Sequence, residues 1–267
     1  TQEIDELEAR ERKYKEKPVP PIGGSLSGEV NHLEKKELVE ETYLFIANSG
    51  DNTVSKVSAT ECKEICTYKV GENPSRTAVS LNKVVWVGNR DSNTVSMLNG
   101  SNCEVINKSI PVGEGPRAMV VDERGHLWVG NYVNNNVWEL NSTGECIRGT
   151  SSNCQYPAIP VPDGPYGGVY DCGGYVWIIS TGANNLTKIR TSDGEIVGNY
   201  PIEAPTYGID QDSEGNIWLG GASSGAVYKV DGSSGDLITV DVGGNTRGIT
   251  VDMNDNAWVA DSAGNRV

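Results

Sequence analysis

The sequence is poor in several residue types on which other protein classes depend. Its 267 residues include one phenylalanine and two histidines, and 36 acidic residues outnumber 22 basic ones, for a formal net charge of −14. Nucleic acids and anionic membranes select proteins with excess positive charge, so neither is expected as the main partner. No stretch approaches the roughly 20 apolar residues of a membrane-spanning helix, so we expect no membrane insertion by this chain.

What the sequence has is a repeat. An aromatic residue recurs at intervals of 40 to 49 residues, a period typical of blade-like arrays. The six positions are Phe45, Trp86, Trp128, Trp177, Trp218 and Trp258. Each aromatic lies in a short β-rich run, followed by Asn, Gly, Ser or Asp turn residues and a second run that closes on Val or Leu, as in VVWVGNRDSNTV.

A further short strand precedes each hairpin, for example RAMVVD, and a fourth follows it, for example NKSIPVG. Four short antiparallel strands in each repeat predict an all-β fold, a β-propeller of six or seven blades over residues 43–267. We expect the aromatic in the middle of the second strand, between adjacent blades. The repeat that contains Trp258 stops at Val267, near the start of its third strand, so the last blade is incomplete in this chain.

Several of these segments resemble known repeats. FIAN at 45–48 and WVGN at 86–89 and 128–131 resemble the YVTN repeat, and Pro165-Tyr166-Gly167 and Tyr207-Gly208-Ile209 resemble the NHL and streptogramin-lyase branches of the same superfamily. The resemblance extends over residues 43–267 and implies a propeller. It does not fix the function, because these families include surface proteins, protein-binding modules and a few enzymes on one scaffold.

Residues 1–42 differ in kind from the repeats. Residues 1–17 are densely charged and indicate a short helix, and Pro18, Pro20, Pro21 and Gly23-Gly24-Ser25 indicate a linker. We expect this charged N-terminal arm to serve attachment or self-association. Either it supplies a strand that closes the propeller, or a longer parent chain or a partner fills the gap; an open propeller would expose apolar blade faces and unpaired strand edges, and we favour the second option.

The six cysteines, an even number, indicate disulfides and an oxidising compartment, so we expect an extracellular or cell-surface location. Three of them occupy matching places in successive repeats, too far apart to pair with one another. Their partners are therefore expected among the other three, with Cys62–Cys66 as one pair and Cys154 within reach of several. The two groups are Cys62, Cys103 and Cys146, and Cys66, Cys154 and Cys172.

With only two histidines and no second paired cysteine motif, we expect no metal and no cofactor. Four Asn-x-Ser/Thr sequons are candidates for glycosylation, although a chain this rich in asparagine produces about that many by chance. They begin at Asn99, Asn107, Asn141 and Asn185.

The candidate binding site lies on the strand that precedes each hairpin, because in a propeller this strand lines the central channel. Five residues align at one position of this strand, each followed by a small residue: Arg76, Arg117, Tyr166, Tyr207 and Arg247. Such a ring can hold a carboxylate, a sulfate or a sugar acid by forked hydrogen bonds and stacking. The alternative is that its members pair with each other and with loop acids and plug the channel.

Two further sets of polar residues follow the aromatics by three and by seven positions. The first comprises Asn48, Asn89, Asn131, Ser180, Gly221 and Asp261, and the second Asn52, Asn93, Asn135, Asn184 and Asn265. Asparagine suits tight turns because it tolerates left-handed backbone. We interpret both sets as turn chemistry, with carbohydrate or calcium contacts as the alternative.

No catalytic residues are predicted. The streptogramin lyases that these repeats resemble use histidine and glutamate with a magnesium ion, whereas His32 precedes the first expected strand and His126 opens a second strand, away from the channel. We therefore interpret the protein as a secreted or surface-displayed propeller that binds a protein or glycan partner and self-assembles. The alternatives are a lyase or lactonase-like hydrolase acting at the channel mouth, and an intracellular scaffold.

Overall fold

The computed structural model describes residues 42–267, which form β-sheets whose strands pair antiparallel, as predicted, apart from one short parallel pair in the third sheet. The predicted arm and linker, the closing strand and His32 lie outside the described residues. The strands in chain order are β1 (Tyr43–Asn48), β2 (Thr53–Ser58), β3 (Lys63–Lys69), β4 (Pro74–Val79), β5 (Val84–Asn89), β6 (Thr94–Asn99), β7 (Val105–Pro111), β8 (Pro116–Val121), β9 (Leu127–Asn131), β10 (Asn136–Leu140), β11 (Cys146–Gly149), β12 (Tyr156–Pro157), β13 (Ile159–Pro160), β14 (Pro165–Tyr170), β15 (Tyr175–Ser180), β16 (Asn185–Arg190), β17 (Ile196–Pro201), β18 (Thr206–Gln211), β19 (Ile217–Gly221), β20 (Ala226–Val230), β21 (Leu237–Asp241), β22 (Thr246–Val251) and β23 (Ala257–Asp261).

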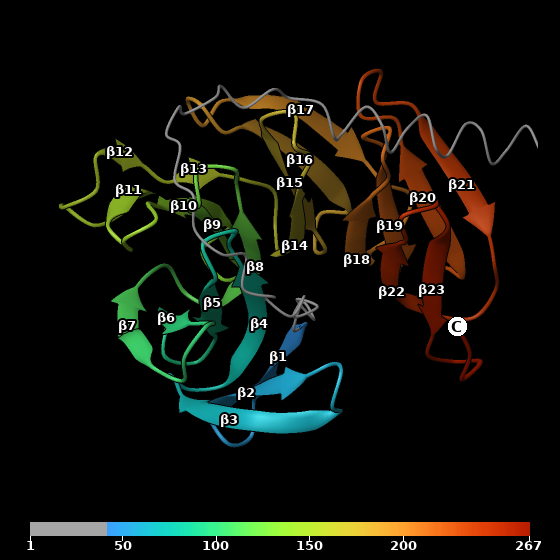
Figure 1. Cartoon of the computed structure of the whole chain (residues 1–267). Helices are drawn as coiled ribbons and strands as arrows, with labels where there is room; N and C mark the ends of the chain where they lie inside the picture. Colours follow the sequence, from blue (N-terminus) through green and yellow to red (C-terminus); the bar gives the residue numbers. More distant parts are fainter. Residues whose placement is uncertain (1–41) are drawn as a thin grey trace, which may run out of the picture. The chain divides into compact units, whose positions relative to one another are not determined.

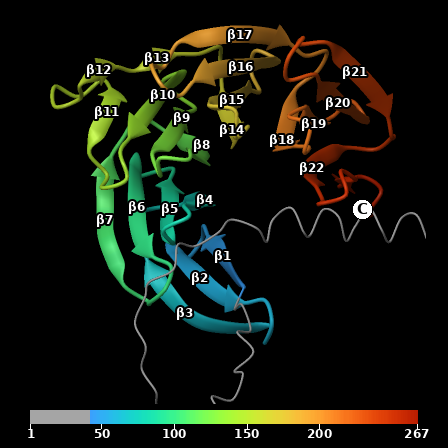
Figure 2. The ribbon, with the colours of Figure 1, turned by 45° about the horizontal axis from the view of Figure 1, so that its top comes forward.

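These strands form six sheets, one for each repeat. Three sheets have four strands in simple up-and-down order: β4 to β7, β14 to β17 and β18 to β21. The sheet of the third repeat contains β8 to β11 in the same order, with two further short strands, β12 paired with β11 and β13 paired with β10. Figures 1 and 2 show the sheets fanned around a central space, with β4, β8, β14, β18 and β22 innermost. Each of these innermost strands contacts the next one along the chain, which is the arrangement of propeller blades.

The first and last sheets differ from the others. Within residues 42–267, the first contains β1 to β3 and lacks an innermost strand, while the last contains only β22 and β23. The fan is open between these two sheets in both ribbon views (Figures 1 and 2). No helix in the described part of the chain is long and apolar enough to cross a membrane.

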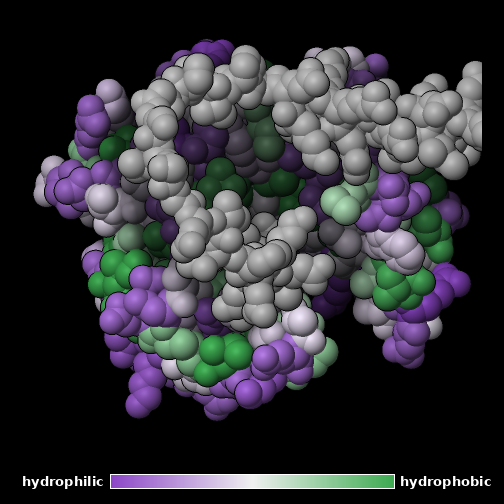
Figure 3. Space-filling view, in the orientation of Figure 1, coloured by the Kyte–Doolittle hydropathy of each residue, from purple (hydrophilic) through white to green (hydrophobic). Residues whose placement is uncertain are grey.

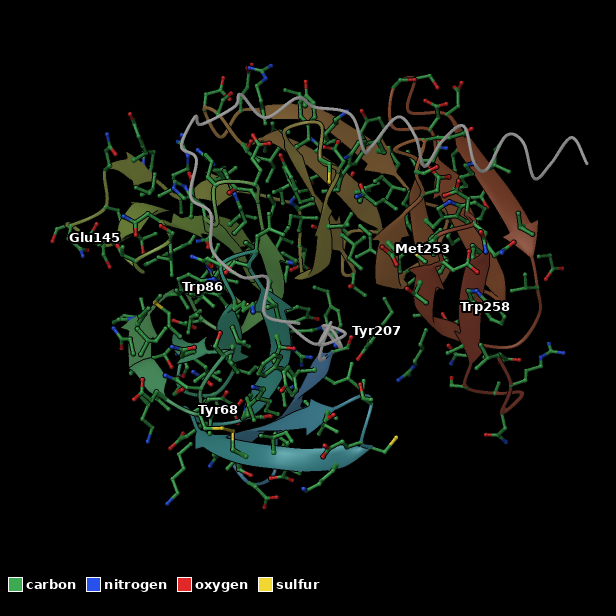
Figure 4. The ribbon with its side chains drawn as sticks, in the orientation of Figure 1. Tyr68, Trp86, Glu145, Tyr207, Met253 and Trp258 are labelled. Atoms are coloured by element: carbon green, nitrogen blue, oxygen red, sulfur yellow. A yellow bond between two sulfur atoms is a disulfide. The ribbon has the colours of Figure 1, made fainter. Side chains whose placement is uncertain are left out.

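The recurring tryptophans lie in the second strand of their sheets, as expected, and Phe45 lies in β1, the first strand of a sheet that has no innermost strand among the described residues. Trp86, Trp128 and Trp177 have no exposed surface, because each is covered by neighbouring strands. Trp258 occupies the equivalent place on β23 but is 53% exposed. Apolar surface is visible on the part of the molecule that contains β22 and β23 (Figure 3), and Trp258 lies at that end of the fan (Figure 4).

An aspartate six residues before the tryptophan accepts a hydrogen bond from the indole N–H in four of the sheets. The pairs are Asp122–Trp128 at 3.0 Å, Asp171–Trp177 at 2.8 Å, Asp212–Trp218 at 2.9 Å and Asp252–Trp258 at 2.9 Å. In the second sheet Ser80 stands at that place, and the buried Trp86 N–H has no partner among the described residues. These aspartates lie in the turn between the first and second strands, so this turn fixes the tryptophan as well as joining the strands.

The asparagines seven residues after the aromatics are turn residues, as interpreted from the sequence. All five have positive φ, between 49° and 57°, where asparagine is tolerated better than most residues. Three of them also accept a backbone N–H from the segment that leads into the next sheet: Asn52 from Asn73 at 2.8 Å, Asn93 from Gly115 at 3.0 Å and Asn135 from Gly164 at 2.9 Å. These side chains therefore link successive sheets.

Two disulfides are present, which supports an oxidising compartment. Cys146–Cys154 is one of the pairings within the predicted reach of Cys154, with Cα atoms 4.8 Å apart. The predicted Cys62–Cys66 pair is wrong: Cys66 bonds to Cys103 across neighbouring sheets, with Cα atoms 6.2 Å apart. Cys66 lies within the extended strand β3, so the chain does not curl back to Cys62. Cys62 and Cys172 are free and exposed.

Candidate binding site at the channel mouth

All five predicted ring residues come from innermost strands: Arg76 from β4, Arg117 from β8, Tyr166 from β14, Tyr207 from β18 and Arg247 from β22. The structure brings their side chains together at one end of the central space, where Tyr207 is labelled in Figure 4. Tyr166 is 8% exposed, whereas Arg247 is exposed. The ring therefore runs from a covered side to an open one.

A β-bulge at the start of each innermost strand presents most of these side chains. In β8, for example, Pro116 pairs with Asn131 and Ala118 with Gly130, so Arg117 is the extra residue opposite the partner strand. Tyr166, Tyr207 and Arg247 occur at the same kind of register shift. A bulge turns a side chain out of the regular ladder, which explains why these residues point into the channel rather than between sheets.

The alignment of Arg76 with the other four is wrong by one residue. In β4 the extra residue is Ser75, and Arg76 pairs with Gly88, which is the place that Ala118, Gly167 and Gly248 occupy in their strands. The error arose because the small residue after Arg76 matched the pattern of the other strands. Arg76 still reaches the ring, because its long side chain extends to the rings of Tyr166 and Tyr207.

Hydrogen bonds and ring contacts join the members of the ring. Arg117 Nη1 donates to the Tyr166 hydroxyl at 2.8 Å, and that hydroxyl donates to the hydroxyl of Tyr207. The Arg76 guanidinium lies 5.2 Å from the Tyr166 ring centre and 5.7 Å from that of Tyr207, and the Arg247 guanidinium lies 5.5 Å from the latter. These separations are within the range of cation–π attraction.

Sequence reasoning missed one member of this cluster, Tyr132. It lies in the turn after β9, with its ring edge-on to Tyr166 at 6.0 Å and 5.9 Å from the Arg117 guanidinium. It is 40% exposed, so it forms part of the rim. The repeat alignment did not find it because the position belongs to the hairpin turn rather than to an innermost strand.

The pKa values of the two tyrosines shift in opposite directions. Burial raises the pKa of Tyr166, and its hydrogen bond to Tyr207 adds to the shift. Burial also acts to raise the pKa of Tyr207, but the hydrogen bond from Tyr166 and the charges of Arg76, Arg117 and Arg247 outweigh it and hold that pKa below its ordinary value. Tyr207 is therefore the phenol of the pair that ionises first.

The ring opens on a cavity of about 340 Å³. Met119, Ile209 and Ile249 provide apolar walls, and glycines keep the backbone accessible between them. Within residues 42–267, no carboxylate forms an ion pair with Arg76, Arg117 or Arg247. The sequence left two arrangements open, a ring that binds an anion and a ring plugged by mutual pairing and loop acids. The ring members do pair with each other, but the described residues supply no loop acids that would neutralise their charge.

His126 lies elsewhere, as the sequence indicated. It precedes β9 and, with Arg124, Arg148 and Glu139, lines a separate cavity of about 380 Å³. Its Nδ1 is 2.8 Å from the buried carboxylate of Glu139, and Asp122 is close enough to both to form a potential metal-binding group.

A metal ion does not fit that group well. Arg124 Nη2 contacts Asp122 at 2.5 Å and Glu139 at 3.0 Å, and Arg148 Nε donates to Glu139 at 3.1 Å. Two guanidiniums therefore already supply the positive charge that a cation would bring. We assign these residues a structural role, because Arg124 also donates to the carbonyl of Thr191 in the next sheet at 3.0 Å.

No protein-family model matches the sequence, and no curated protein matches it in sequence. Solved structures do share its fold. A streptogramin B lyase has a TM-score of 0.71 at 14% identity, covering 82% of this chain and 72% of the lyase, and virginiamycin B lyase from Staphylococcus aureus has a TM-score of 0.70 at 15% identity, covering 83% and 74%.

The same fold occurs in proteins with other descriptions. Hydrazine synthase from Kuenenia stuttgartiensis matches with a TM-score of 0.68 at 19% identity, covering 82% of this chain and 70% of that one. A protein of unknown function from Bacteroides caccae matches with a TM-score of 0.60 at 12% identity, covering 84% of each chain. The predicted likeness to lyase-type propellers is thus confirmed for the fold, and at these identities it shows the fold alone.

Proposed function

We propose that this protein is a secreted or surface-displayed binding module that holds an anionic group, such as the carboxylate of a sugar acid, at the mouth of its channel. The observation that carries the proposal is the cluster of three guanidiniums, Arg76, Arg117 and Arg247, around two linked phenols with no ion-paired acid among the described residues. In a chain of net charge −14, such a cluster concentrates positive charge at one point.

The ligand chemistry follows from the walls of the cavity. Guanidiniums bind carboxylate or sulfate oxygens through forked hydrogen bonds, and the faces of Tyr207 and Tyr132 offer stacking surfaces for a flat apolar or sugar-ring face. Apolar side chains below the ring, such as Met119 and Ile209, suit a ligand with an uncharged body. A sugar acid or a glycan that carries one combines these features.

The direct test uses D-glucuronate as the probe, with D-glucose as its neutral counterpart, in calorimetric titration or protein NMR. We expect glucuronate and not glucose to bind, and Arg117→Ala with Arg247→Ala to weaken binding at least tenfold, because a hydrogen bond to a charged group contributes about 1.5 to 3 kcal/mol. Arg190→Ala is the matched control, since Arg190 lies at the end of β16 and pairs with Asp193 and Glu195. Equal losses in the control and ring variants would contradict the proposal.

The lowered pKa of Tyr207 gives a second test. Ionised Tyr207 would neutralise part of the guanidinium charge, so affinity for glucuronate should fall as pH rises through that pKa. Tyr207→Phe removes the ionisable group and should flatten the alkaline limb of the affinity profile below about pH 10, the ordinary pKa of tyrosine. An unchanged slope in this variant would show that Tyr207 does not set the charge of the site.

A lyase or hydrolase acting at the same cavity is the second candidate function. The observation in its favour is Tyr207 itself, because three nearby positive charges favour its phenolate form, which can accept a proton. Product analysis of a bound ligand separates the two functions. Loss of turnover in folded Arg117→Ala and Arg247→Ala variants would favour the enzyme, whereas recovery of the ligand intact would favour the binding module.

We further propose that residues 1–42 mediate attachment or self-association. Support comes from the contrast between their charged, proline-interrupted sequence and the repeats that follow. Removing residues 1–21 should lower the molecular mass measured by light scattering if this segment holds copies together. If the number of chains in each particle stays the same after the deletion, a role in self-association is ruled out.

A further inference from the structure

A groove of about 680 Å³ lies on the outer side of the molecule, between the outer strands β7 and β11 of the second and third sheets. Ile110, Trp138 and Leu140 form its floor, and Glu145 lines it near the outer edge of the third sheet (Figure 4). This groove is separate from the channel cavity, since the two have no lining residue in common.

The groove arises where the fourth strand of the third sheet is interrupted. β10 pairs with β11 only at Glu139 and Leu140, and with β13 only at Asn136 and Val137. Trp138, between these pairs, has no strand partner on that side. The repeat is longer than the others, and the Cys146–Cys154 disulfide holds the extra residues as a loop beside the gap.

The lining has the composition of a site for an uncharged, hydroxyl-rich ligand. Ser109, Ser151, Asn153 and Gln155 offer hydroxyls and amides around the apolar floor, and none of the residues from 42 to 267 that line the groove is lysine or arginine. The channel cavity has the opposite character, with three guanidiniums. Sugars present both hydroxyls for such polar rims and apolar C–H faces for such floors, whereas an anion would find no positive charge here.

One wall of this groove carries a complete sequon, Asn107-Lys108-Ser109, on the outer strand β7. Asn107 is exposed, and its side-chain oxygen accepts the backbone N–H of Ser109 at 3.0 Å. Among the described residues, nothing accepts a hydrogen bond from its Nδ2, the atom that an N-linked sugar would occupy. The amide nitrogen therefore faces solvent beside the groove.

The other three sequons are less available. Asn185 is 8% exposed, and its Nδ2 donates to Thr187 and Asn199, both at 3.1 Å. Asn141 is half-buried and donates to Glu145 at 2.8 Å.

Asn99 is also half-buried, and it caps the turn that follows β6 by accepting from Ser101 and Asn102 at 2.9 and 3.3 Å. The hydroxyl of Tyr68 contacts the carbonyls of Asn99 and Asn102 in the same turn. An attached glycan at Asn99 would therefore leave from a packed turn rather than from an open strand.

We propose that Asn107 is the principal N-glycosylated residue of this chain and that the first sugars of its glycan lie in the groove between β7 and β11. In the reaction, Asn107 Nδ2 loses a proton and bonds to C1 of the sugar of a lipid-pyrophosphate-linked oligosaccharide donor, and the C1–O bond to pyrophosphate breaks. The inference rests on the proposed secreted location and is independent of ligand binding at the channel.

Occupancy is tested by secreting the full chain from a mammalian host and mapping glycopeptides by mass spectrometry before and after peptide N-glycosidase F treatment. We expect most molecules to carry a glycan at Asn107 and none at Asn185. Asn107→Gln and Ser109→Ala should each remove that glycan, while Ser109→Thr keeps the sequon and the glycan. A secreted chain with Asn107 unoccupied, or glycosylated mainly at another sequon, would overturn the proposal.

The location of the sugars is tested on the same material after trimming to one N-acetylglucosamine. Its acetyl methyl group should show nuclear Overhauser contacts to methyl groups of Ile147 or Ile110 in the groove. Gln155→Arg with Ser151→Arg narrows the rim without touching the sequon, so it should abolish these contacts with occupancy at Asn107 unchanged. Absence of the contacts in the unaltered protein would overturn the groove as the resting place of the glycan.

In this experiment the expression host secretes the chain, so glycan occupancy at Asn107 is measured separately from glucuronate binding at the channel. Failure of glucuronate to bind with Asn107 occupied would contradict only the proposed channel function. Failure of occupancy with glucuronate bound would contradict only the glycan site.

Discussion

The third and sixth sheets carry the same local hairpin but differ in what covers it. In both, an aspartate six residues earlier accepts the indole N–H of the tryptophan, at 3.0 Å for Asp122–Trp128 and 2.9 Å for Asp252–Trp258. Trp128 has no exposed surface, whereas Trp258 is 53% exposed. The comparison teaches that the hairpin places its tryptophan through local hydrogen bonds, while burial by neighbouring sheets is a separate contribution to stability.

The largest expected effect comes from truncating the two tryptophans. Trp128→Ala should lower the free energy of unfolding by about 3 to 5 kcal/mol, because it leaves a large cavity in a closely packed core. Trp258→Ala should cost less than about 1 kcal/mol, because half of that side chain is already in water. Urea unfolding of both variants, followed by circular dichroism, measures the difference, and equal losses would show that burial does not separate the two sheets.

A smaller effect is expected from the aspartates, and it depends on pH. Burial alone would raise the pKa of Asp212, but hydrogen bonds from Asn216 and Trp218 lower it to about 2. Since the folded pKa lies below the ordinary value, the stabilisation is complete above about pH 4 and is lost as pH falls toward 2. It amounts to about 2 kcal/mol.

Asp212→Asn should therefore flatten the acid limb of the stability curve between pH 4 and 2. In the sixth sheet, hydrogen bonds from Trp258 and Asn256 also lower the pKa of Asp252. That residue is less buried than Asp212, so solvent screens its interactions more and Asp252→Asn should change the curve less. Thermal unfolding midpoints measured across this pH range compare the two variants. A larger change for Asp252→Asn would reverse the comparison.

The smallest expected effect is a gain. The second sheet has Ser80 in place of the aspartate, and the buried N–H of Trp86 has no partner among residues 42–267. Ser80→Asp should restore the missing hydrogen bond and raise the free energy of unfolding by about 1 kcal/mol, with Ser80→Ala as the control. A net loss in chemical denaturation would mean that burying the carboxylate costs more than the hydrogen bond returns.

Much of the fold could be predicted because each repeat places the same residue types at the same strand and turn positions. The spacing of the tryptophans placed them correctly in the second strands, and the asparagine turns agreed with positive φ at positions such as Asn93 and Asn135. The Asp–Trp hydrogen bond was missed although its signal was present, since four of the five recurring tryptophans have aspartate six residues earlier.

The candidate site was predicted less completely, for geometric reasons. Arg117, Tyr166, Tyr207 and Arg247 were placed correctly because they occupy one bulge position in each strand. The sequence did carry a signal for the shift at Arg76, because Arg76 lies ten residues before Trp86, whereas the other four lie eleven residues before their tryptophans. Contacts between repeats were predicted only in part. Cys66 was among the expected partners of Cys103, but the choice of that pair depends on how neighbouring sheets pack against each other.

The bulge that opens each innermost strand has a consequence for how such a protein can change over time. A bulged side chain is outside the cross-strand ladder, so replacing it alters the chemistry of the channel without disturbing the sheet behind it. The bulge positions can therefore change without changing the sheets, and both guanidiniums and phenols already occupy them, as at Arg117 and Tyr166. Substitutions at this ring can therefore change the ligand specificity while the tryptophans keep the sheets packed together.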